Sequence, residues 1–341
     1  MPFADVVGHD RAKSLLQLAT LNNRIAHAYL FHGPDRIGKR LLAVRFIQAM
    51  CCEAAQGLER RDACGCCRSC RHIEQGSHPD FCVVTPDTSG ATPRIKIEEI
   101  RELESRLIYR PLIAERKYCL IDDAESLTIE AANALLKTLE EPPGYALLIL
   151  IASRPYALPA TIRSRCQSLR FTALSQAQSC AALIEARRIS EADAQLLAAV
   201  SEGRFGEALT TDLTALRERH EALAALTAPR SLRSVSAILA AAEALAKNDE
   251  PAADALDRLA SWVHDLVFVQ IGMPPERLAH PNHLSTLRTV AATADIDLLL
   301  DVLSDIETFQ RNSTRNLNHQ LMLEHILLRL RDATNTASVA R

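Results

Sequence analysis

The stretch Gly33-Pro-Asp-Arg-Ile-Gly38-Lys39-Arg40 matches the phosphate-binding pattern G-x-x-x-x-G-K, but it lacks the Ser or Thr that normally follows. In such a loop the glycines let backbone N–H groups close around phosphates, the Lys reaches the β and γ phosphates, and the hydroxyl binds Mg²⁺. Arg40 stands at the hydroxyl position. A guanidinium is always charged and has no acceptor, so it cannot ligate a cation. The sequence therefore predicts a nucleotide-binding fold whose own hydrolysis is impaired or absent.

The residues that flank this loop favour a phosphate-binding loop over an ordinary glycine turn. An apolar run, Ala28-Tyr-Leu-Phe31, precedes the loop, and helically spaced apolar residues follow it from Leu41 to Ile47. Strand, loop and helix in this order is the context in which the pattern binds phosphate. Because Gly33, Gly38 and Lys39 are retained, ATP binding without turnover stays open, although the Arg makes it doubtful.

A second half of the site is predicted at Asp122-Asp123. These carboxylates follow Tyr118-Cys-Leu-Ile121, a continuous apolar run typical of a strand buried on both faces. The carboxyl end of such a strand is where ligands bind in α/β sheets, and we expect Asp122 to hold Mg²⁺ through water. The next position would normally carry the base that orients attacking water, and Asp123 is one methylene shorter than Glu there. The alternative is that the pair only caps a helix.

Composition limits the class of protein. The chain has 341 residues, of which 48% are hydrophobic and 24% charged, so we expect a globular protein of two or three domains. It contains no apolar run of membrane-spanning length, and its first residues, Met1 to Asp5, lack the pattern of a signal peptide, so we expect a cytoplasmic protein without membrane contact. The net charge of -3 gives no basic footprint for autonomous nucleic-acid binding.

Six of the ten cysteines lie close together in the sequence, and their spacing predicts a metal site. Cys64-x₂-Cys67-x₂-Cys70 is regular, and Cys52 lies upstream at the end of the helix that leaves the phosphate loop. Four thiolates suit tetrahedral Zn²⁺ in a closed, structural site. An iron–sulfur centre and reduced cysteines without metal are the alternatives. Spacing alone does not decide between Cys51 and Cys52, or between Cys66 and Cys67.

The apolar pattern predicts a parallel sheet followed by helices. Apolar runs at 28–31, 81–84, 117–121, 145–152 and 168–171 alternate with helical patterns, which is typical of βαβ units. One predicted helix carries Ile97, Ile100, Leu103 and Leu107, with Glu98, Glu99, Arg101 and Glu102 facing water. A second runs from Thr128 to Leu139 and stops at Glu140-Glu-Pro-Pro-Gly144.

Beyond Phe171 the sequence predicts helices only, with Ser190 as an N-cap. Two apolar stripes are expected to form an ordinary bundle core: Leu323, Ile326, Leu327 and Leu330, and Ile296, Leu299, Leu300 and Leu303. The boundaries that follow are an α/β domain at 1–171 with a cysteine module at about 51–72, short helices at 172–210, a helical domain at 211–333, and a disordered tail at 334–341.

These residues together resemble the subunits of bacterial clamp loaders, within the AAA+ ATPases. The resemblance is strong over about residues 1–210, and it lies in Val7-Gly8-His9, His27-Ala-Tyr-Leu-Phe31, the phosphate loop, the cysteine module with His78-Pro-Asp80, Asn133-Ala-Leu-Leu-Lys-Thr-Leu-Glu-Glu-Pro-Pro143, and Ser164-Arg165-Cys166. It implies an AAA+ P-loop domain with a zinc module, a small helical lid at 172–210 and a helical collar at 211–333. Only length and type connect the helical remainder with the collar.

Within this family, the altered loop and Asp123 resemble the delta-prime type of subunit of DNA polymerase III rather than the ATP-hydrolysing gamma/tau type. Gly206 aligns with the lid arginine by which family ATPases sense the γ-phosphate, although Arg204 lies nearby. By the same resemblance, Arg165 is an arginine finger that acts in trans on the ATP site of a neighbouring gamma subunit. The alternative is a surface ion pair, and Arg154 and Arg163 are close in sequence.

The resemblance also implies partners: gamma/tau and delta subunits, the beta sliding clamp, and primed DNA reached through the complex. The expected function is a non-hydrolysing subunit that helps to load the clamp during replication, within a DNA polymerase holoenzyme. Two alternatives remain, an active gamma/tau-type ATPase and a zinc-dependent nucleic-acid adaptor. The adaptor predicts DNA affinity of the isolated chain that falls steeply with salt.

Overall fold

The computed structural model of the chain describes residues 3, 5–54, 62–89, 92–226, 234–247, 252–311 and 318–334. Apart from Thr334, the tail predicted at 334–341 therefore lies outside the described residues. The chain divides into two compact units, which are described separately. Unit 1 contains Met1–Ala182 and Gly203–Glu207, and unit 2 contains Leu183–Glu202 and Ala208–Arg341.

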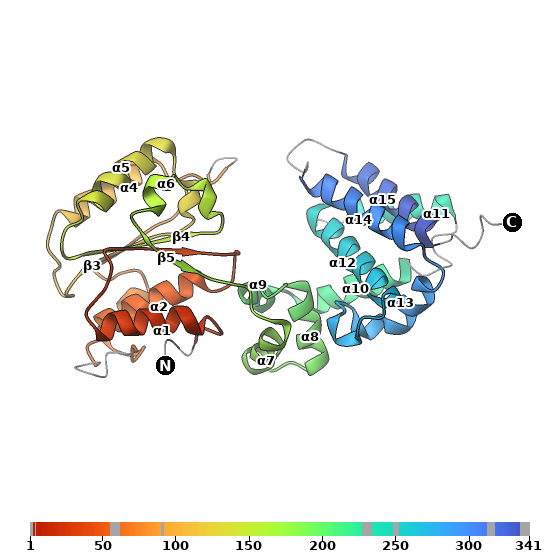
Figure 1. The fold of residues 1–341 in the computed structure, drawn as a ribbon, viewed down its shortest axis with the longest axis horizontal. Helices are drawn as coiled ribbons and strands as arrows, with labels where there is room; N and C mark the ends of the chain where they lie inside the picture. Colours follow the sequence, from red (N-terminus) through yellow and green to blue (C-terminus); the bar gives the residue numbers. More distant parts are fainter. Residues whose placement is uncertain are drawn as a thin grey trace. The chain divides into compact units, whose positions relative to one another are not determined.

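Unit 1 is built on a sheet of five parallel strands (Figure 1). The strands are β1 (Ala28–His32), β2 (Phe81–Val84), β3 (Lys117–Ile121), β4 (Ala146–Ala152) and β5 (Gln167–Arg170), in the spatial order β2-β3-β4-β1-β5. The three central strands are almost continuously buried, which explains why each reads as an unbroken apolar run. The predicted parallel sheet is confirmed, and β2 and β5 form its edges.

Helices cover both faces of this sheet, as Figure 1 shows. One face packs on α1 (Asp10–Leu21), α2 (Lys39–Cys51) and α3 (Arg68–Glu74), and the other on α4 (Ile97–Leu107), α5 (Ile129–Glu140) and α6 (Ala160–Arg163). Alternation along β1 divides its side chains between the two cores: Tyr29 and Phe31 join the first, and Ala28 and Leu30 the second. The three-layer α/β class is thereby confirmed.

Two predicted helices of unit 1 begin and end close to the expected residues. Thr128 caps α5, because its side chain accepts a hydrogen bond from the N–H of Ala131. In α4, Ile100 and Leu103 are buried as predicted. Glu99 departs from the prediction that it faces water, because it is only half exposed and its Oε2 is buried. Glu99 directly precedes the buried Ile100, and it lines a pocket that lies between α4 and β2.

The described residues beyond β5 form helices and no further strand. They are α7 (Gln176–Arg187), α8 (Glu191–Val200), α9 (Phe205–Thr210), α10 (Leu213–Leu226), α11 (Val235–Lys247), α12 (Ala252–Gln270), α13 (Leu284–Ala291), α14 (Ile296–Arg311) and α15 (His319–Thr334). Short 3₁₀ turns lie at η2 (Ala124–Ser126), η3 (Pro155–Ala157), η4 (Pro275–Arg277) and η5 (Pro281–His283). Ser190 caps α8 as predicted, by accepting from the N–H of Asp193.

The core of unit 2 confirms one predicted stripe and corrects the other. All four residues of the stripe on α15 are buried, around the fully buried Trp262 of α12. On α14 the face is rotated: Leu299, Val302 and Ile306 are buried, whereas Ile296 is 36% and Leu300 50% exposed. The i, i+3, i+7 positions from Leu299 meet the neighbouring helices α12 and α15, so the stripe chosen from its i, i+4 pairs pointed partly to solvent.

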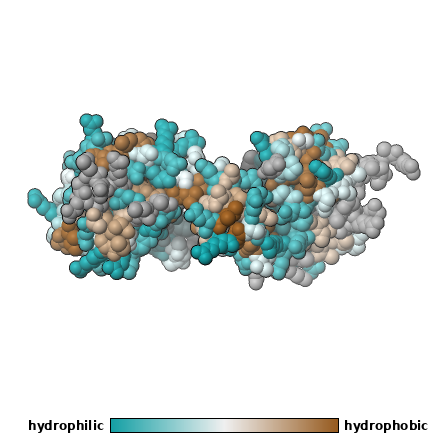
Figure 2. Space-filling view, turned by 90° about the horizontal axis from the view of Figure 1, so that it is seen from below, coloured by the Kyte–Doolittle hydropathy of each residue, from teal (hydrophilic) through white to brown (hydrophobic). Residues whose placement is uncertain are grey.

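The molecular surface carries both hydrophilic and hydrophobic side chains. On the face drawn in Figure 2, hydrophilic residues cover most of the surface and hydrophobic residues form small separate patches. Among the described residues, no helix combines the length and the apolar character that spanning a membrane requires.

Candidate nucleotide site and cysteine cluster

The phosphate loop lies at the carboxyl end of β1, and its two glycines are required by geometry. Gly33 donates its N–H to the carbonyl of Ala152 at 3.2 Å, and a Cβ on Gly33 would lie 2.2 Å from the carbonyl oxygen of Phe171. Gly38 precedes α2 with φ +98°, a conformation that glycine adopts without strain. The predicted strand, loop and helix are therefore present.

Lys39 is turned back onto its own loop. Its side chain is 5% exposed, and Nζ donates to the carbonyls of Gly33 and Pro34, both at 2.6 Å, and to Oγ of Ser153 at 3.2 Å. Burial lowers the pKa of Lys39, and the nearest carboxylate, on Asp35, opposes that shift. All three ammonium protons have acceptors within the protein, so a phosphate would have to replace some of them.

Arg40 pairs with the carboxylate that was expected to hold Mg²⁺. Its NH1 lies 3.1 Å from Oδ2 of Asp122, whose side chain is 15% exposed. The residue that replaces the metal-binding hydroxyl thus also neutralises the acid on the opposite side of the site. The loss of the metal-binding hydroxyl and the neutralisation of Asp122 are therefore both effects of Arg40.

Asp123 has a strained backbone conformation and lies close to other carboxylates. It lies in the left-handed region with φ +46°, and its side chain makes no capping hydrogen bond to η2, so the helix-cap alternative has no support there. Partial desolvation, followed by the carboxylates of Asp122 and Glu125, raises the pKa of Asp123. Among the residues that the structure describes, none with a positive charge forms an ion pair with the carboxylate of Asp123.

Ser153 and Glu125 also belong to this site, although they were not predicted from the sequence. Ser153 directly follows β4 and bonds to both Lys39 and Asp35. Oε1 of Glu125 accepts from the N–H groups of Ser153 and Arg154, at 2.9 and 3.1 Å. The signal that could have found Ser153 is its place as the first polar residue after a buried strand, at the same sheet edge as Asp122.

Gly206 lies directly against the phosphate loop. Its N–H donates to the carbonyl of Arg36 at 2.8 Å, and a Cβ on Gly206 would lie 2.7 Å from that oxygen. A side chain could be added only if the loop moved. Arg204 forms an ion pair with Glu207 at 3.1 Å.

Arg165 follows α6 and is held by contacts within the chain. Its NH2 lies 2.6 Å from Oε1 of Glu140, its NH1 donates to the carbonyl of Thr161 at 3.0 Å, and its side chain is 35% exposed. Arg163 differs, because its guanidinium lies over the ring of Tyr156, 5.2 Å from the centroid. Of these two arginines, Arg165 is the one joined to the predicted stop of α5.

Four of the six clustered cysteines come together in space. The sulfur atoms of Cys52, Cys64, Cys67 and Cys70 all lie within 4.8 Å of one another. Four sulfurs around a zinc ion, each about 2.3 Å from it, would be separated by roughly 3.8 Å, so the cluster needs little contraction to fit a tetrahedral ion. This geometry favours Cys52 over Cys51, and Cys67 over Cys66, which spacing had left open.

Backbone donors prepare this cluster for thiolates. Sulfur atoms of three cysteines accept N–H groups at 3.2–3.4 Å, from Cys64 to Cys52, from Cys67 to Cys64, and from Cys70 to Cys67. The N–H groups of Cys66 and Cys67 lower the pKa of Cys64 to about 6. Cys51 is different, since burial raises the pKa of its thiol to about 12. A metal would need the thiolate forms, which the N–H groups stabilise.

A group of exposed apolar side chains follows α4, in residues 108–113. Ile108, Tyr109, Leu112 and Ile113 are 64–79% exposed. The buried carboxylate of Asp80 accepts the N–H groups of Leu112, Ile113 and Ala114 at 2.7–2.9 Å. We call this segment the apolar loop. Contiguous exposed apolar groups on a fixed backbone are a feature of surfaces that contact other proteins.

Comparison with protein families identifies two matching segments. The sequence profile described as "DNA polymerase III, delta subunit" matches residues 8–175, and the profile described as "DNA polymerase III, delta subunit, C terminal" matches residues 214–332. Together these profiles cover most of the chain, and the first contains the phosphate loop, the cysteine cluster and Arg165.

Similar curated proteins are subunits of the same enzyme. The chain is 41% identical to the DNA polymerase III subunit delta' of Pseudomonas aeruginosa over 41% of this chain and 42% of that protein. It is 29% identical to the delta' subunit of Escherichia coli over 89% and 88%. It is 39% identical to the tau/gamma subunit of Haemophilus influenzae over 52% of this chain but 24% of that protein.

The chain covers less than half of the length of three of these curated proteins: 24% of the tau/gamma subunit of Haemophilus influenzae, 48% of the tau subunit of Bacillus subtilis, and 42% of the delta' subunit of Pseudomonas aeruginosa. Among solved structures, a DNA polymerase III gamma subunit-related protein of Thermotoga maritima has a TM-score of 0.47 and 18% identity, over 96% of this chain and 100% of that one.

Proposed function

The chain belongs to the clamp-loader subunits of bacterial DNA polymerase III, and from that membership we propose that it is a delta-prime-type subunit that does not hydrolyse ATP. In this role it helps to load the sliding clamp onto primed DNA as part of a complex with gamma/tau and delta subunits in the cytoplasm. Residues 172–210 serve as its lid and 211–333 as its collar.

One observation carries the proposal: the 3.1 Å ion pair between Arg40 and Asp122. Hydrolysis of this kind needs Mg²⁺, which a loop hydroxyl and an acidic residue hold against the phosphates. Here the hydroxyl is absent, and a fixed positive charge lies where the cation would bind. Two unit charges of like sign about 4 Å apart repel by about 4 kcal/mol at an effective dielectric constant of 20, which is enough to exclude the metal.

Arg165 supplies the catalytic contribution of this subunit, in trans. An arginine presented to a neighbouring ATP site stabilises the charge that develops on the transferred phosphoryl group, and it can raise the rate by about 10³–10⁵. In the separate chain, Glu140 and the Thr161 carbonyl hold the guanidinium against the ends of α5 and α6, where it is partly exposed. Because these contacts already restrict the side chain of Arg165, it would lose less conformational entropy on reaching the ATP site of the neighbour.

The four clustered cysteines, Cys52, Cys64, Cys67 and Cys70, hold a structural zinc ion. With four sulfur ligands the site would be closed, so zinc would contribute to folding and not to catalysis. It would connect the end of α2 with α3, two helices that already share the first core. The apolar loop supports a place in an assembly, since four exposed large side chains are kept on a rigid backbone.

The second candidate is an active ATPase of the gamma/tau type. The match to the tau/gamma subunit of Haemophilus influenzae favours it, because its identity of 39% is close to the 41% of the delta' subunit of Pseudomonas aeruginosa. An active enzyme would have to bind Mg²⁺ beside Arg40, and Arg40→Ser would then barely change its turnover.

Steady-state ATP hydrolysis by the purified chain, alone and assembled with a gamma-type partner, tests the proposal. We expect no turnover alone, and assembled turnover that falls by at least about 10³ in Arg165→Ala. Arg154→Ala is the matched control, since Arg154 is an exposed arginine that follows β4 and lies outside Ser164-Arg165-Cys166. Turnover by the isolated chain would favour the second candidate, and unchanged assembled turnover in Arg165→Ala would refute the finger.

A further inference from the structure

Two cysteines outside the zinc cluster lie next to each other on neighbouring strands. Cys82 of β2 and Cys119 of β3 are direct partners in the parallel register, and their sulfur atoms are 3.0 Å apart. Neighbouring strands are about 4.8 Å apart, which lies within the 4.4–6.8 Å range of Cα separations that a disulfide spans. The two thiols can therefore be joined without rearranging the backbone.

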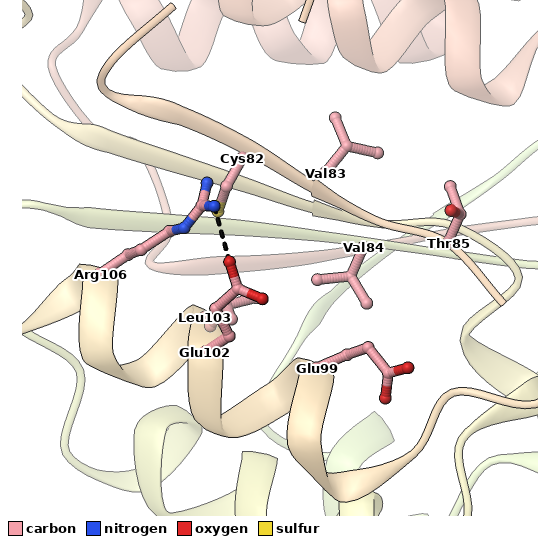
Figure 3. A pocket seen from close by; sticks show the side chains of 8 residues that line it. All are labelled: Cys82, Val83, Val84, Thr85, Glu99, Glu102, Leu103 and Arg106. Carbon is pink, nitrogen blue, oxygen red and sulfur yellow. Dashed lines mark hydrogen bonds and ion pairs between the residues drawn. The ribbon is translucent and has the colours of Figure 1, made fainter. Parts of the chain in front are cut away.

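Only one of these thiols is accessible. Cys119 is 1% exposed, whereas Cys82 is partly exposed, because β2 is an edge strand. Cys82 opens into a pocket of about 200 Å³ between β2 and α4, which Figure 3 shows. The pocket is lined by Val83, Val84 and Thr85 from the strand side, and by Glu99, Glu102, Leu103 and Arg106 from the helix.

The surroundings distinguish the two sulfur atoms. The hydrogen bond between the two thiols, together with the positive charges of Arg106 and Lys117, lowers the pKa of Cys82 against the effect of burial. The interaction with Cys82, together with burial, raises the pKa of Cys119. A partly exposed thiol with a lowered pKa beside a buried thiol with a raised pKa is the arrangement of an attacking and a resolving cysteine.

The charges of the pocket indicate which molecules would enter it. Arg106 is paired with Glu102 at 2.7 Å, as the dashed line in Figure 3 marks. Glu99 has no ion pair among the described residues, and its buried Oε2 accepts no hydrogen bond there. A carboxylate without a donor is costly, and a ligand ammonium group would supply one.

We propose that Cys82 and Cys119 form a dithiol site that reacts with small disulfides carrying an ammonium group and ends as a disulfide between β2 and β3. The thiolate of Cys82 attacks one sulfur of the small disulfide, whose S–S bond breaks, and the departing thiolate takes up the proton that Cys82 released. Cys119 then loses its proton and attacks the Cys82 sulfur, which expels the second small thiol. The two protein thiols are oxidised by two electrons, and the small disulfide is reduced to two thiols.

The test uses the full, zinc-loaded, reduced chain with cystamine as the probe, under argon at pH 7, followed by intact-mass measurement and peptide mapping. We expect the loss of H₂ in mass, with the peptides of Cys82 and Cys119 linked. In Cys119→Ala a stable mixed disulfide of Cys82 with cysteamine, one half of cystamine, should collect, and in Cys82→Ser neither residue should react. Cys180→Ser is the control, and it should react like the native chain.

Charge selectivity gives an independent measurement. Reaction at Cys82 should be several-fold slower with the anionic disulfide dithiodiglycolate than with cystamine, and Glu99→Gln should reduce that difference. Melting curves establish that each variant is folded. The proposal would be overturned if Cys82 reacted no faster than Cys180, if Cys119→Ala collected no adduct, or if the native chain kept both thiols while other cysteines were modified.

Discussion

The ion pair between Arg40 and Asp122 is the contact on which the proposed lack of ATP hydrolysis depends. In sequence these residues are 82 positions apart, yet their side chains meet at 3.1 Å across the mouth of the phosphate loop. Arg40 is 57% exposed, so the pair adds little to folding stability. Its effect is local: it places a guanidinium where a metal–nucleotide complex would need a divalent cation.

Replacing Arg40 by Ser should therefore restore a dependence on Mg²⁺. In Arg40→Ser we expect ATP to bind at least about tenfold more tightly with Mg²⁺ than without it, since removing a repulsion of 1.4 kcal/mol is enough for that factor. Titration with a fluorescent ATP analogue, with and without Mg²⁺, measures this. Arg40→Lys keeps the charge and should show no gain. Equal affinities with and without Mg²⁺ in Arg40→Ser would mean that Arg40 is not what excludes the metal.

At the scale of elements, the cysteine module shows how a short segment is fixed without a large core. It joins the end of α2 to the seven-residue helix α3, and residues 55–61 between them lie outside the described part of the chain. A helix of this length is not stable alone. Its Cys70 and Ile73 are buried in the first core, and the proposed zinc ion would supply the remaining connection through the four sulfur atoms.

Loss of one sulfur should release the metal. Cys70→Ser is expected to abolish bound zinc and to lower the melting temperature, because a three-ligand site binds more weakly and leaves a buried hydroxyl in the core. Elemental analysis by mass spectrometry and a thermal melt measure the two effects. Cys66→Ser is the matched control and should keep its zinc. Retention of zinc by Cys70→Ser, or its loss from Cys66→Ser, would contradict the assigned ligand set.

The apolar loop depends on a single carboxylate. Burial alone would raise the pKa of Asp80, but the N–H groups of Ala114, Ile113 and Leu112 outweigh it and lower that pKa. In Asp80→Ala three backbone donors lose their acceptor, and we expect a loss of about 3 kcal/mol in the free energy of unfolding. Amide exchange in residues 108–114 should accelerate strongly. Asp87→Ala, at a partly exposed carboxylate that bonds to Ser89 and Lys96, should leave that exchange unchanged, and unaltered protection in Asp80→Ala would refute the role of Asp80.

The elements themselves could be predicted well, for an identifiable reason. Strands buried on both faces need apolar residues at every position, so β1, β3 and β4 are visible as runs with nearly their observed ends. Helix α14 shows the limit of this approach. Its apolar residues allow two neighbouring faces, and only packing against α12 and α15 decides that Leu299 is buried and Leu300 exposed.

At the scale of the whole molecule, both units contain a buried ionisable group that makes stability depend on pH. In unit 1 this group is Asp80, whose pKa is lowered. In unit 2 it is His220, which is 3% exposed and stacks on His280 with 4.5 Å between the ring centroids. Burial, followed by the charge of His280, lowers the pKa of His220 to about 3.

Stability should therefore fall as the solution becomes acidic, in two ranges. Between about pH 6.5 and 3 the unfolded chain binds a proton at His220 that the folded chain does not, so stability decreases with falling pH by up to about 1.4 kcal/mol per unit. The contribution of Asp80 is present above its ordinary pKa of 3.8 and is lost below it.

Thermal melts between pH 8 and pH 5 test the first range. The native chain should lose stability across it, and His220→Leu should have a flatter profile because it removes the proton-binding group. His264→Leu is the control at another histidine of unit 2, and its profile should keep the native slope. A slope that His220→Leu does not reduce would show that other groups cause the acid sensitivity.

The sequence alone determined the features that depend on residues close together in the chain. These are the strand, loop and helix with an arginine at position 40, the central buried strands, the helical second half, and a cysteine spacing typical of metal sites. Contacts between distant residues were decided only by the tertiary structure. These are the pairing of Arg40 with Asp122, the contact of Ser153 with Lys39, the choice of Cys52 and Cys67, and the closeness of Cys82 to Cys119. Apolar periodicity limits which side of an element can be buried, but packing decides between neighbouring helix faces, as in α14, and strand order and register decide which side chains meet across the sheet.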